Sequence, residues 1–319
     1  MRSSRRFALG ASILATVALV GTAGGGALVS AQDQPTVRIG SDGFYESQLM
    51  AEIYGQALEA AGFGVDRQLA IGARPARVEA FESGQIDLTP EYVGSGLGYY
   101  VVGSENEELA AIEVSGDGET NRANLQAALD IAGVEATVLA ITAGEDTNAA
   151  VVRGDTAEEL GVTSISDLAA VAGEVTFGLP PECEVNALCR GALEDGYGIA
   201  WPPANLELLP PCGAEMAGAL EGTAIDVAWL CSTQPVIAQN GGVVLEDDRD
   251  TQPAEHLAPI VRTDFLEQVD GGAEAIAAIL DPISAQVTTE VLTELGVRIA
   301  VDQESIDDVA AEFIASLEG

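Results

Sequence analysis

Aromatic, hydroxyl and acidic residues gather where two predicted strands end. The first strand, Thr36–Gly40, leads into a Ser-Asp-Gly-Phe-Tyr segment and then a helix, and the second, Ile86–Thr89, leads into Pro-Glu-Tyr. Aromatic faces stabilise cations that cannot donate hydrogen bonds, and the N–H groups at a helix start favour anionic groups. These side chains predict a site for a small polar or charged ligand. Its candidate contacts here are Ser41, Phe44, Asp87, Tyr92 and Ser95.

Catalytic chemistry has little support in the sequence. His256 is the only histidine, no serine lies in a nucleophile-elbow motif, and no phosphate-binding glycine loop is present in the mature chain. The four cysteines do not have the spacing of paired zinc knuckles, and they fit structural pairs better than a nucleophile. We therefore predict a binding protein that is not an enzyme and that uses no metal or cofactor.

The charge of the chain argues against polyanionic partners. The net charge is −38, with 51 acidic residues against 13 basic residues that are all arginine. Such a surface repels nucleic acid and anionic membranes. The acids are spread along the chain, which favours adaptation to a salty or alkaline exterior over a field that gathers cationic ligands.

Residues 1–31 predict a signal peptide. Arg2, Arg5 and Arg6 precede an apolar run rich in glycine and alanine, and Val29-Ser30-Ala31 offers a cleavage point. The run is long enough to span a bilayer, so an uncleaved anchor stays an alternative. Both interpretations place the protein outside the cytoplasm, in a periplasm or at the outer face of the cell membrane.

Strands and helices alternate along the mature chain, which predicts an α/β fold of mostly parallel sheets flanked by helices. Ser164 and Asp167 predict a capping box at one helix start. The predicted strands are 36–40, 65–71, 86–89, 136–142, 149–153, 175–178, 206–209, 225–230, 243–246 and 258–262. The predicted helices are 46–61, 75–83, 122–132, 165–171, 188–197, 214–220, 235–240, 273–280, 286–295 and 306–317.

Two short polar segments divide the chain into lobes. Residues 143–147 and 247–251 each follow a predicted strand directly. They predict a first lobe made of residues 36–146 and 248–319, and a continuous second lobe made of residues 147–247. Two segments that cross between lobes are typical of a hinge that closes on a ligand.

The four cysteines fit an oxidising compartment. Three pairings are possible. We favour Cys183–Cys189 and Cys212–Cys231, because each pair closes a short segment within one lobe. Both pairs are predicted to be structural.

An ordered set of motifs carries a family resemblance over nearly all of the mature chain. The motifs are IGSDGFYES at 39–47, IDLTPEYVG at 86–94, AEELG at 157–161, SDLA at 166–169, PPEC at 180–183, IDVA at 225–228 and VLEDD at 244–248. With these motifs the chain resembles the substrate-binding proteins of ABC importers for glycine betaine, choline, carnitine and related osmoprotectants. The resemblance implies a two-lobed type II periplasmic-binding fold, with the ligand in the cleft between the lobes.

The resemblance also implies roles for single residues. Tyr92 matches a tyrosine of the family's aromatic cage, and Ser95 lies where a hydroxyl often assists. Asn148 stands where an aromatic residue can stand, and Asn186 where some members carry an arginine that grips a carboxylate. We expect Asn148 and the region of Glu182 to close on the ligand from the second lobe.

The predicted function is that of the extracytoplasmic binding component of an importer for glycine betaine or a related quaternary ammonium compound. The implied partners are the small ligand and a membrane permease driven by an ATPase, and we expect a monomer. Two alternatives stay open at this point. One is another small polar or cationic solute, and the other is a sensory ligand-binding module.

Overall fold

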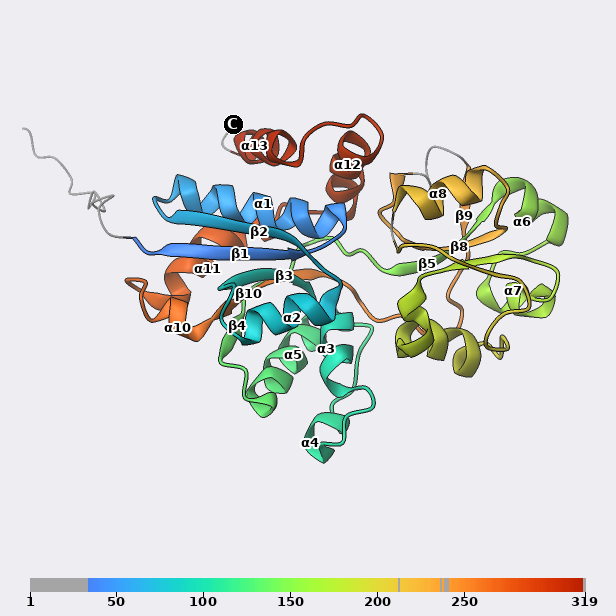
Figure 1. Ribbon diagram of the computed structural model, residues 1–319, viewed down its shortest axis with the longest axis horizontal. Coiled ribbons are helices and arrows are strands. Elements are labelled where there is room, and N and C mark those ends of the chain that lie inside the picture. The colour runs from blue at the N-terminus through green and yellow to red at the C-terminus, as the bar shows by residue number, and fades with distance from the viewer. Residues whose placement is uncertain (1–33, 212, 236, 238–240, 318–319) are drawn as a thin grey trace, which may run out of the picture. The chain divides into compact units, whose positions relative to one another are not determined.

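The computed structural model describes residues 34–211, 213–235, 237 and 241–317, so the predicted signal peptide lies outside the described residues. The described residues fall in one compact unit that contains two five-stranded sheets (Figure 1). The strand orders are β2-β1-β3-β10-β4 and β7-β6-β8-β5-β9. The fold is α/β, as predicted.

The first sheet is built from both ends of the described chain. Its strands are β1 Thr36–Asp42, β2 Gly64–Gly72, β3 Leu88–Tyr92, β4 Ala136–Val138 and β10 Leu257–Arg262. Its helices are α1 Tyr45–Ala60, α2 Arg74–Glu82, α3 Val93–Val101, α4 Glu107–Ala110, α5 Gly118–Ala132, α10 Thr263–Leu266, α11 Gly272–Ser284, α12 Thr289–Ala300 and α13 Ile306–Leu317.

The second sheet is built from the middle of the chain. Its strands are β5 Asn148–Arg153, β6 Phe177–Leu179, β7 Leu206–Leu208, β8 Val227–Cys231 and β9 Gly242–Val244. Its helices are α6 Gly154–Leu160, α7 Ile165–Val171, the 3-10 helix η1 Pro181–Val185, the π-helix η2 Ala187–Gly196 and α8 Ala214–Glu221. Most of the predicted helix 235–240 lies outside the described residues.

Each sheet is mostly parallel, as predicted, with one strand that runs antiparallel to the other four. β1 runs parallel to β2 and β3, but β10 runs antiparallel to β3 and β4. In the second sheet β6 runs parallel to β7 and β8, but β5 runs antiparallel to β8 and β9. β5 and β10 are the antiparallel strands because they follow the two segments that cross between the two sheets, residues 143–147 and 247–251, here called the first and second crossovers. Each therefore starts beside the carboxyl end of a neighbouring strand, Leu257 opposite Tyr92 and Asn148 opposite Cys231.

Helices cover both faces of the first sheet, as the alternation of buried residues along β10 shows (Figure 1). Leu257 and Val261 pack in a core with residues of α1, α11, α12 and α13, whereas Ala258 and Ile260 pack in a core with residues of α2, α3 and α5.

Among the described residues, no single helix is long and apolar enough to cross a membrane. Only α11 and α12 taken together, a pair bent by 80°, are long and apolar enough.

The segments that join the two sheets are hydrogen-bonded to each other. The Asp146 N–H donates to the Glu255 carbonyl oxygen at 2.9 Å, and Glu145 forms an antiparallel bridge with His256. The His256 ring reaches the carbonyl oxygens of Thr142 and Gly144, both at 2.9 Å from Nδ1. The second crossover therefore extends beyond residues 247–251 to the start of β10.

Candidate ligand-binding site

The carboxyl end of β1 is fastened to its surroundings by its own polar groups. The buried Ser41 hydroxyl donates to the Asp42 carbonyl oxygen and accepts from the Ala70 N–H, both at 3.0 Å. The Asp42 N–H donates to Ser47 Oγ at 3.0 Å, and the Gly43 N–H donates to the carbonyl oxygen of the last residue of β2 at 2.7 Å. Ser41 therefore holds β1 to β2, and two backbone donors near the start of α1 already have partners.

Phe44 and Tyr92, here called the ring pair, lie together at the ends of β1 and β3. Phe44 is the N-cap residue of α1, and Tyr92 is the last residue of β3. Their ring centroids are 6.0 Å apart, and the ring planes are tilted by 33°. The Tyr92 side chain is buried, and its hydroxyl donates to Glu46 Oε1 at 2.7 Å. The ring pair thus faces a carboxyl group in the first turn of α1.

Glu46 joins residues that follow strands of both sheets. It is 2% exposed, and its Oε2 accepts from the Thr233 hydroxyl at 2.7 Å. Thr233 lies two residues after the end of β8, so this bond connects α1 with the segment that follows a strand of the second sheet. The Thr233 N–H in turn donates to Asp146 Oδ1 at 2.9 Å, and the Ser232 hydroxyl reaches the same oxygen at 3.2 Å.

Glu46 and Asp146, here called the carboxyl pair, are both buried and lie close enough to shift each other's pKa. Burial raises the pKa of Glu46, although the hydroxyls of Tyr92 and Thr233 act in the opposite direction. Burial and the charge of Glu46 raise the pKa of Asp146 well above its usual range. Because two adjacent carboxylates repel each other, the pair retains a proton more tightly than separate carboxyl groups would.

The carboxyl pair differs from the other buried acids near these strand ends. Glu91 and Asp42 are also buried, but both pair with Arg77, and Glu91 also pairs with Arg74 at 3.1 Å. These two arginines lower the pKa of Glu91 against the effect of burial. No ion pair with an arginine is formed by Glu46 or Asp146 within the described residues. An organic cation that lay against the ring pair would supply the missing positive charge.

The comparisons with known proteins show the family of this chain. Residues 35–316 match the family described as the substrate binding domain of ABC-type glycine betaine transport systems. The chain belongs to this family. It is therefore a substrate-binding component of ABC-type transport and not an enzyme.

Similar proteins cover nearly the whole matched region. The chain is 26% identical over 288 residues to a glycine-betaine-binding protein of Pseudomonas aeruginosa, covering 88% of this chain and 87% of that protein. It is 26% identical to the solved structure of apo YehZ from Escherichia coli, with a TM-score of 0.62 over 88% of this chain and 98% of that one. A solved glycine betaine/carnitine/choline ABC transporter protein has a TM-score of 0.68 at 18% identity, covering 88% of this chain and 98% of that one, and shares the fold. The fold is the type II periplasmic-binding fold.

Three residues expected at the family's ligand site have other surroundings in this structure. Asp87 lies at the opposite end of β3 from Tyr92, where its Oδ2 accepts from Arg38 Nε at 2.8 Å. The Ser95 hydroxyl accepts from Arg74 at 2.6 Å, and its N–H donates to a carboxyl oxygen of Glu255 at 3.0 Å. Glu182 is exposed in η1. The structure therefore gathers Phe44 and Tyr92 but does not bring these three to the ring pair.

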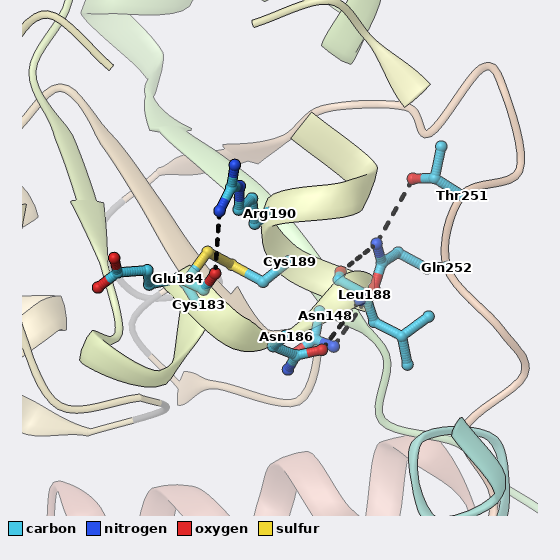
Figure 2. The surroundings of a disulfide bond; sticks show 9 residues. All are labelled: Asn148, Cys183, Glu184, Asn186, Leu188, Cys189, Arg190, Thr251 and Gln252. Atoms are coloured by element: carbon cyan, nitrogen blue, oxygen red, sulfur yellow. Dashed lines mark hydrogen bonds between the residues drawn. A yellow bond between two sulfur atoms is a disulfide. The ribbon is translucent and has the colours of Figure 1, made fainter. Parts of the chain in front are cut away.

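Asn148 takes part in a contact between β5, the second crossover and η2. Its Nδ2 donates to Gln252 Oε1 at 3.3 Å, and Gln252 Nε2 donates to the Leu188 carbonyl oxygen at 2.9 Å (Figure 2). Asn186, which stands at the arginine position of some family members, caps η2 by accepting from the Leu188 N–H at 2.9 Å. Asn186 is thus a capping residue in this structure.

One of the two predicted disulfides is described. Cys183 and Cys189 are bonded, with Cα atoms 5.1 Å apart, and the bond links η1 to η2 (Figure 2). Both half-cystines are buried in the core of the second sheet. Cys212 lies outside the described residues, so the Cys212–Cys231 pair stays a prediction, although Cys231 is not a free thiol.

The sequence analysis missed the carboxyl pair and Thr233 as site residues. Glu46 is the acid in the first turn of α1, a place where acids are common for helix stability alone. Asp146 and Thr233 follow β4 and β8 in polar loops. The available signal was their position, because Asp146 lies two residues before β5 and Thr233 lies two residues after β8.

Proposed function

We propose that this protein binds glycine betaine or a related quaternary ammonium compound outside the cytoplasm and delivers it to a membrane permease of an ABC importer. The observation that carries the proposal is the ring pair beside a buried carboxyl group that has no arginine partner among the described residues. Ring faces and a carboxyl group together suit a cation that cannot donate hydrogen bonds. Glycine betaine, carnitine and choline, the compounds in the names of the similar proteins, belong to this chemical class.

The ligand is held between two lobes that close by bending at the crossovers. The first lobe consists of residues 36–146 and 248–319, and the second of residues 147–247. The bond from Thr233 to Glu46 supports this division, because it connects the segment that follows a second-sheet strand to α1. Ligand shifts the balance between open and closed forms only by its difference in affinity for the two forms. Closure then changes the surface that the permease recognises.

Export precedes this function. Residues 1–31 act as a signal peptide, and the mature protein works in a periplasm or at the outer face of the cell membrane. The bonded Cys183–Cys189 pair supports an oxidising compartment.

Isothermal titration of the mature protein tests the proposal. Glycine betaine, choline, carnitine and proline betaine are titrated at low and at molar salt, with the disulfides intact. Saturable binding of at least one compound supports the function. Absence of binding at both salt concentrations, by a protein shown to be folded, overturns the ligand class and leaves the transport family as the only established property.

A substitution of Tyr92 tests the site itself. Tyr92→Ala removes one ring of the ring pair and should weaken the ligand about tenfold, since one ring contributes roughly 1.4 kcal/mol. Tyr99→Ala is the matched control, because Tyr99 is 45% exposed and packs edge-on against Tyr100 instead. Equal affinities for wild type and Tyr92→Ala would remove Tyr92 from the site.

A further inference from the structure

In the part of the chain that the structure describes, the positive side chains already have partners, which bears on the kind of ligand that the site accepts. The sequence has no lysine, and its single histidine binds carbonyl oxygens of the first crossover. Arg249 donates to the Gly196 carbonyl oxygen and lies over the Tyr197 ring. The other arginines of the described chain form ion pairs with carboxylates, namely Arg38, Arg67, Arg74, Arg77, Arg122, Arg153, Arg190, Arg262 and Arg298.

Three backbone donors near the carboxyl pair have partners as well. The Thr233 N–H donates to Asp146, and the N–H groups of Asp42 and Gly43 at the start of α1 have the partners described above. A ligand carboxylate at this site would lie against two buried carboxyl groups. No positive side chain of the described residues would be free to pair with it. Its burial there is therefore unfavourable.

One neutral hydroxyl group does remain available. The Tyr45 hydroxyl oxygen is buried beside Thr233 and has no hydrogen-bond partner of acceptable geometry among the described residues. Its position is fixed by packing, because a Cβ on Gly296 of α12 would lie 2.9 Å from the Tyr45 oxygen. A buried hydroxyl without a partner is unfavourable, and an alcohol group on a ligand could both donate to it and accept from it.

We infer that the site prefers a quaternary ammonium alcohol of the choline type, which carries a net positive charge, over a zwitterionic betaine. This inference rests on the proposed function and concerns the same site. The ammonium group lies against the ring pair, and its charge is balanced by Glu46 and Asp146. The alcohol group pairs with the Tyr45 hydroxyl. The anionic end of a betaine could also accept from the Tyr45 hydroxyl, but it would lie against the two carboxyl groups of the carboxyl pair.

Three probes with the same ammonium head separate these contributions. Tetramethylammonium supplies the cation alone, choline adds a hydroxyl group, and glycine betaine adds a carboxylate. Titration of the wild-type protein should give the order choline, tetramethylammonium, glycine betaine, with choline at least about tenfold tighter than glycine betaine. Equal or tighter binding of glycine betaine would overturn the inference while the proposed function stands. If none of the three binds, nor any other quaternary ammonium compound, both fail.

Two variants test the residues named. Glu46→Gln removes one charge of the carboxyl pair at nearly constant volume and should reduce choline affinity about tenfold, with a smaller loss for glycine betaine. Glu59→Gln, on the exposed part of the same helix, removes the same charge from the protein and should change both affinities little. Asp146→Asn serves as the second test if Glu46→Gln does not fold. Equal losses for choline and glycine betaine in a folded variant would contradict the assigned role of the carboxyl pair.

Tyr45→Phe completes the design. It should lower the affinity for choline and leave that for tetramethylammonium unchanged, because only choline has the alcohol group that the Tyr45 hydroxyl would bind. An equal effect on both probes would show that the Tyr45 hydroxyl does not bind the ligand alcohol and would overturn this part of the inference.

Discussion

Glu255 gives the stability of this protein a pH dependence that one substitution should remove. The side chain is 2% exposed, one carboxyl oxygen accepts from the Ser95 N–H at 3.0 Å, and Oε1 is buried without a partner in the described part of the chain. Burial raises the pKa of Glu255 to about 7, although the Ser95 N–H and the charge of Arg74 act in the opposite direction. The folded protein therefore keeps this carboxyl group protonated under mildly acidic conditions.

The sign and size of the effect follow from linkage. The folded pKa of about 7 exceeds the ordinary value of 4.5, so the folded state binds the proton more tightly than the unfolded state. The stabilisation is complete below about pH 4.5 and is lost as the pH rises through about 7. The difference between the two values corresponds to about 3 kcal/mol of unfolding free energy, of which about 2.5 kcal/mol is lost between pH 5 and pH 8.

Urea unfolding of wild type and Glu255→Gln at pH 5 and pH 8 measures this contribution. Glutamine cannot ionise, so the stability of the variant relative to wild type should rise by about 2.5 kcal/mol between pH 5 and pH 8. Glu105→Gln, at an exposed position, should show the same relative stability at both pH values. If the difference between wild type and Glu255→Gln is also independent of pH, the argument from burial is refuted.

Three further outcomes are expected. Choline affinity should increase with pH, because the pKa values of Glu46 and Asp146 are raised in the empty protein and a bound cation favours their ionised forms. Binding should therefore release a proton, which calorimetry in buffers of different ionisation enthalpy should detect. The double variant Cys183→Ala, Cys189→Ala should lose about 2 kcal/mol of unfolding free energy, the value for a loop this short, and equal stability under reducing and oxidising conditions in wild type would contradict it. The melting temperature should rise from low to molar salt, because salt screens the repulsion within a chain of net charge −38, and a fall would show that surface ion pairs dominate.

The positions of the elements could be predicted because their signals are local. The predicted strand Thr36–Gly40 is the greater part of β1, and the predicted helix 46–61 differs from α1 by one residue at each end. The capping box is confirmed, since the Ser164 side chain accepts from the Asp167 N–H and the Asp167 side chain accepts from the Ser164 N–H. Each of these signals depends on residues that are close in the chain, so no tertiary information is needed.

The partners of buried acids could not be predicted, because they are far apart in the chain. Asp87 and Tyr92 belong to the same motif, but the partner of Asp87, Arg38, lies 49 residues earlier in the chain. Along a strand, alternate side chains point to opposite faces, and the two ends of β3 lie in different surroundings. Proximity in the sequence therefore placed Asp87 with Tyr92, whereas the sheet separates them. The bond from Thr233 to Glu46 spans 187 residues and crosses between the sheets.

The buried acids fall into two groups, one that stabilises the strand ends and one that belongs to the candidate ligand site. Asp42 and Glu91 are compensated by Arg77, so their burial is consistent with a stable and rigid strand end. Glu46 and Asp146 are buried with hydroxyl and N–H donors but form no arginine ion pair within the described residues, and their pKa values are raised accordingly. Burial of incompletely compensated carboxyl groups lowers stability, and proteins retain such features mainly at functional sites. A ligand that brings its own positive charge removes this unfavourable term only when it is bound, so the same residues that destabilise the empty protein favour the cation.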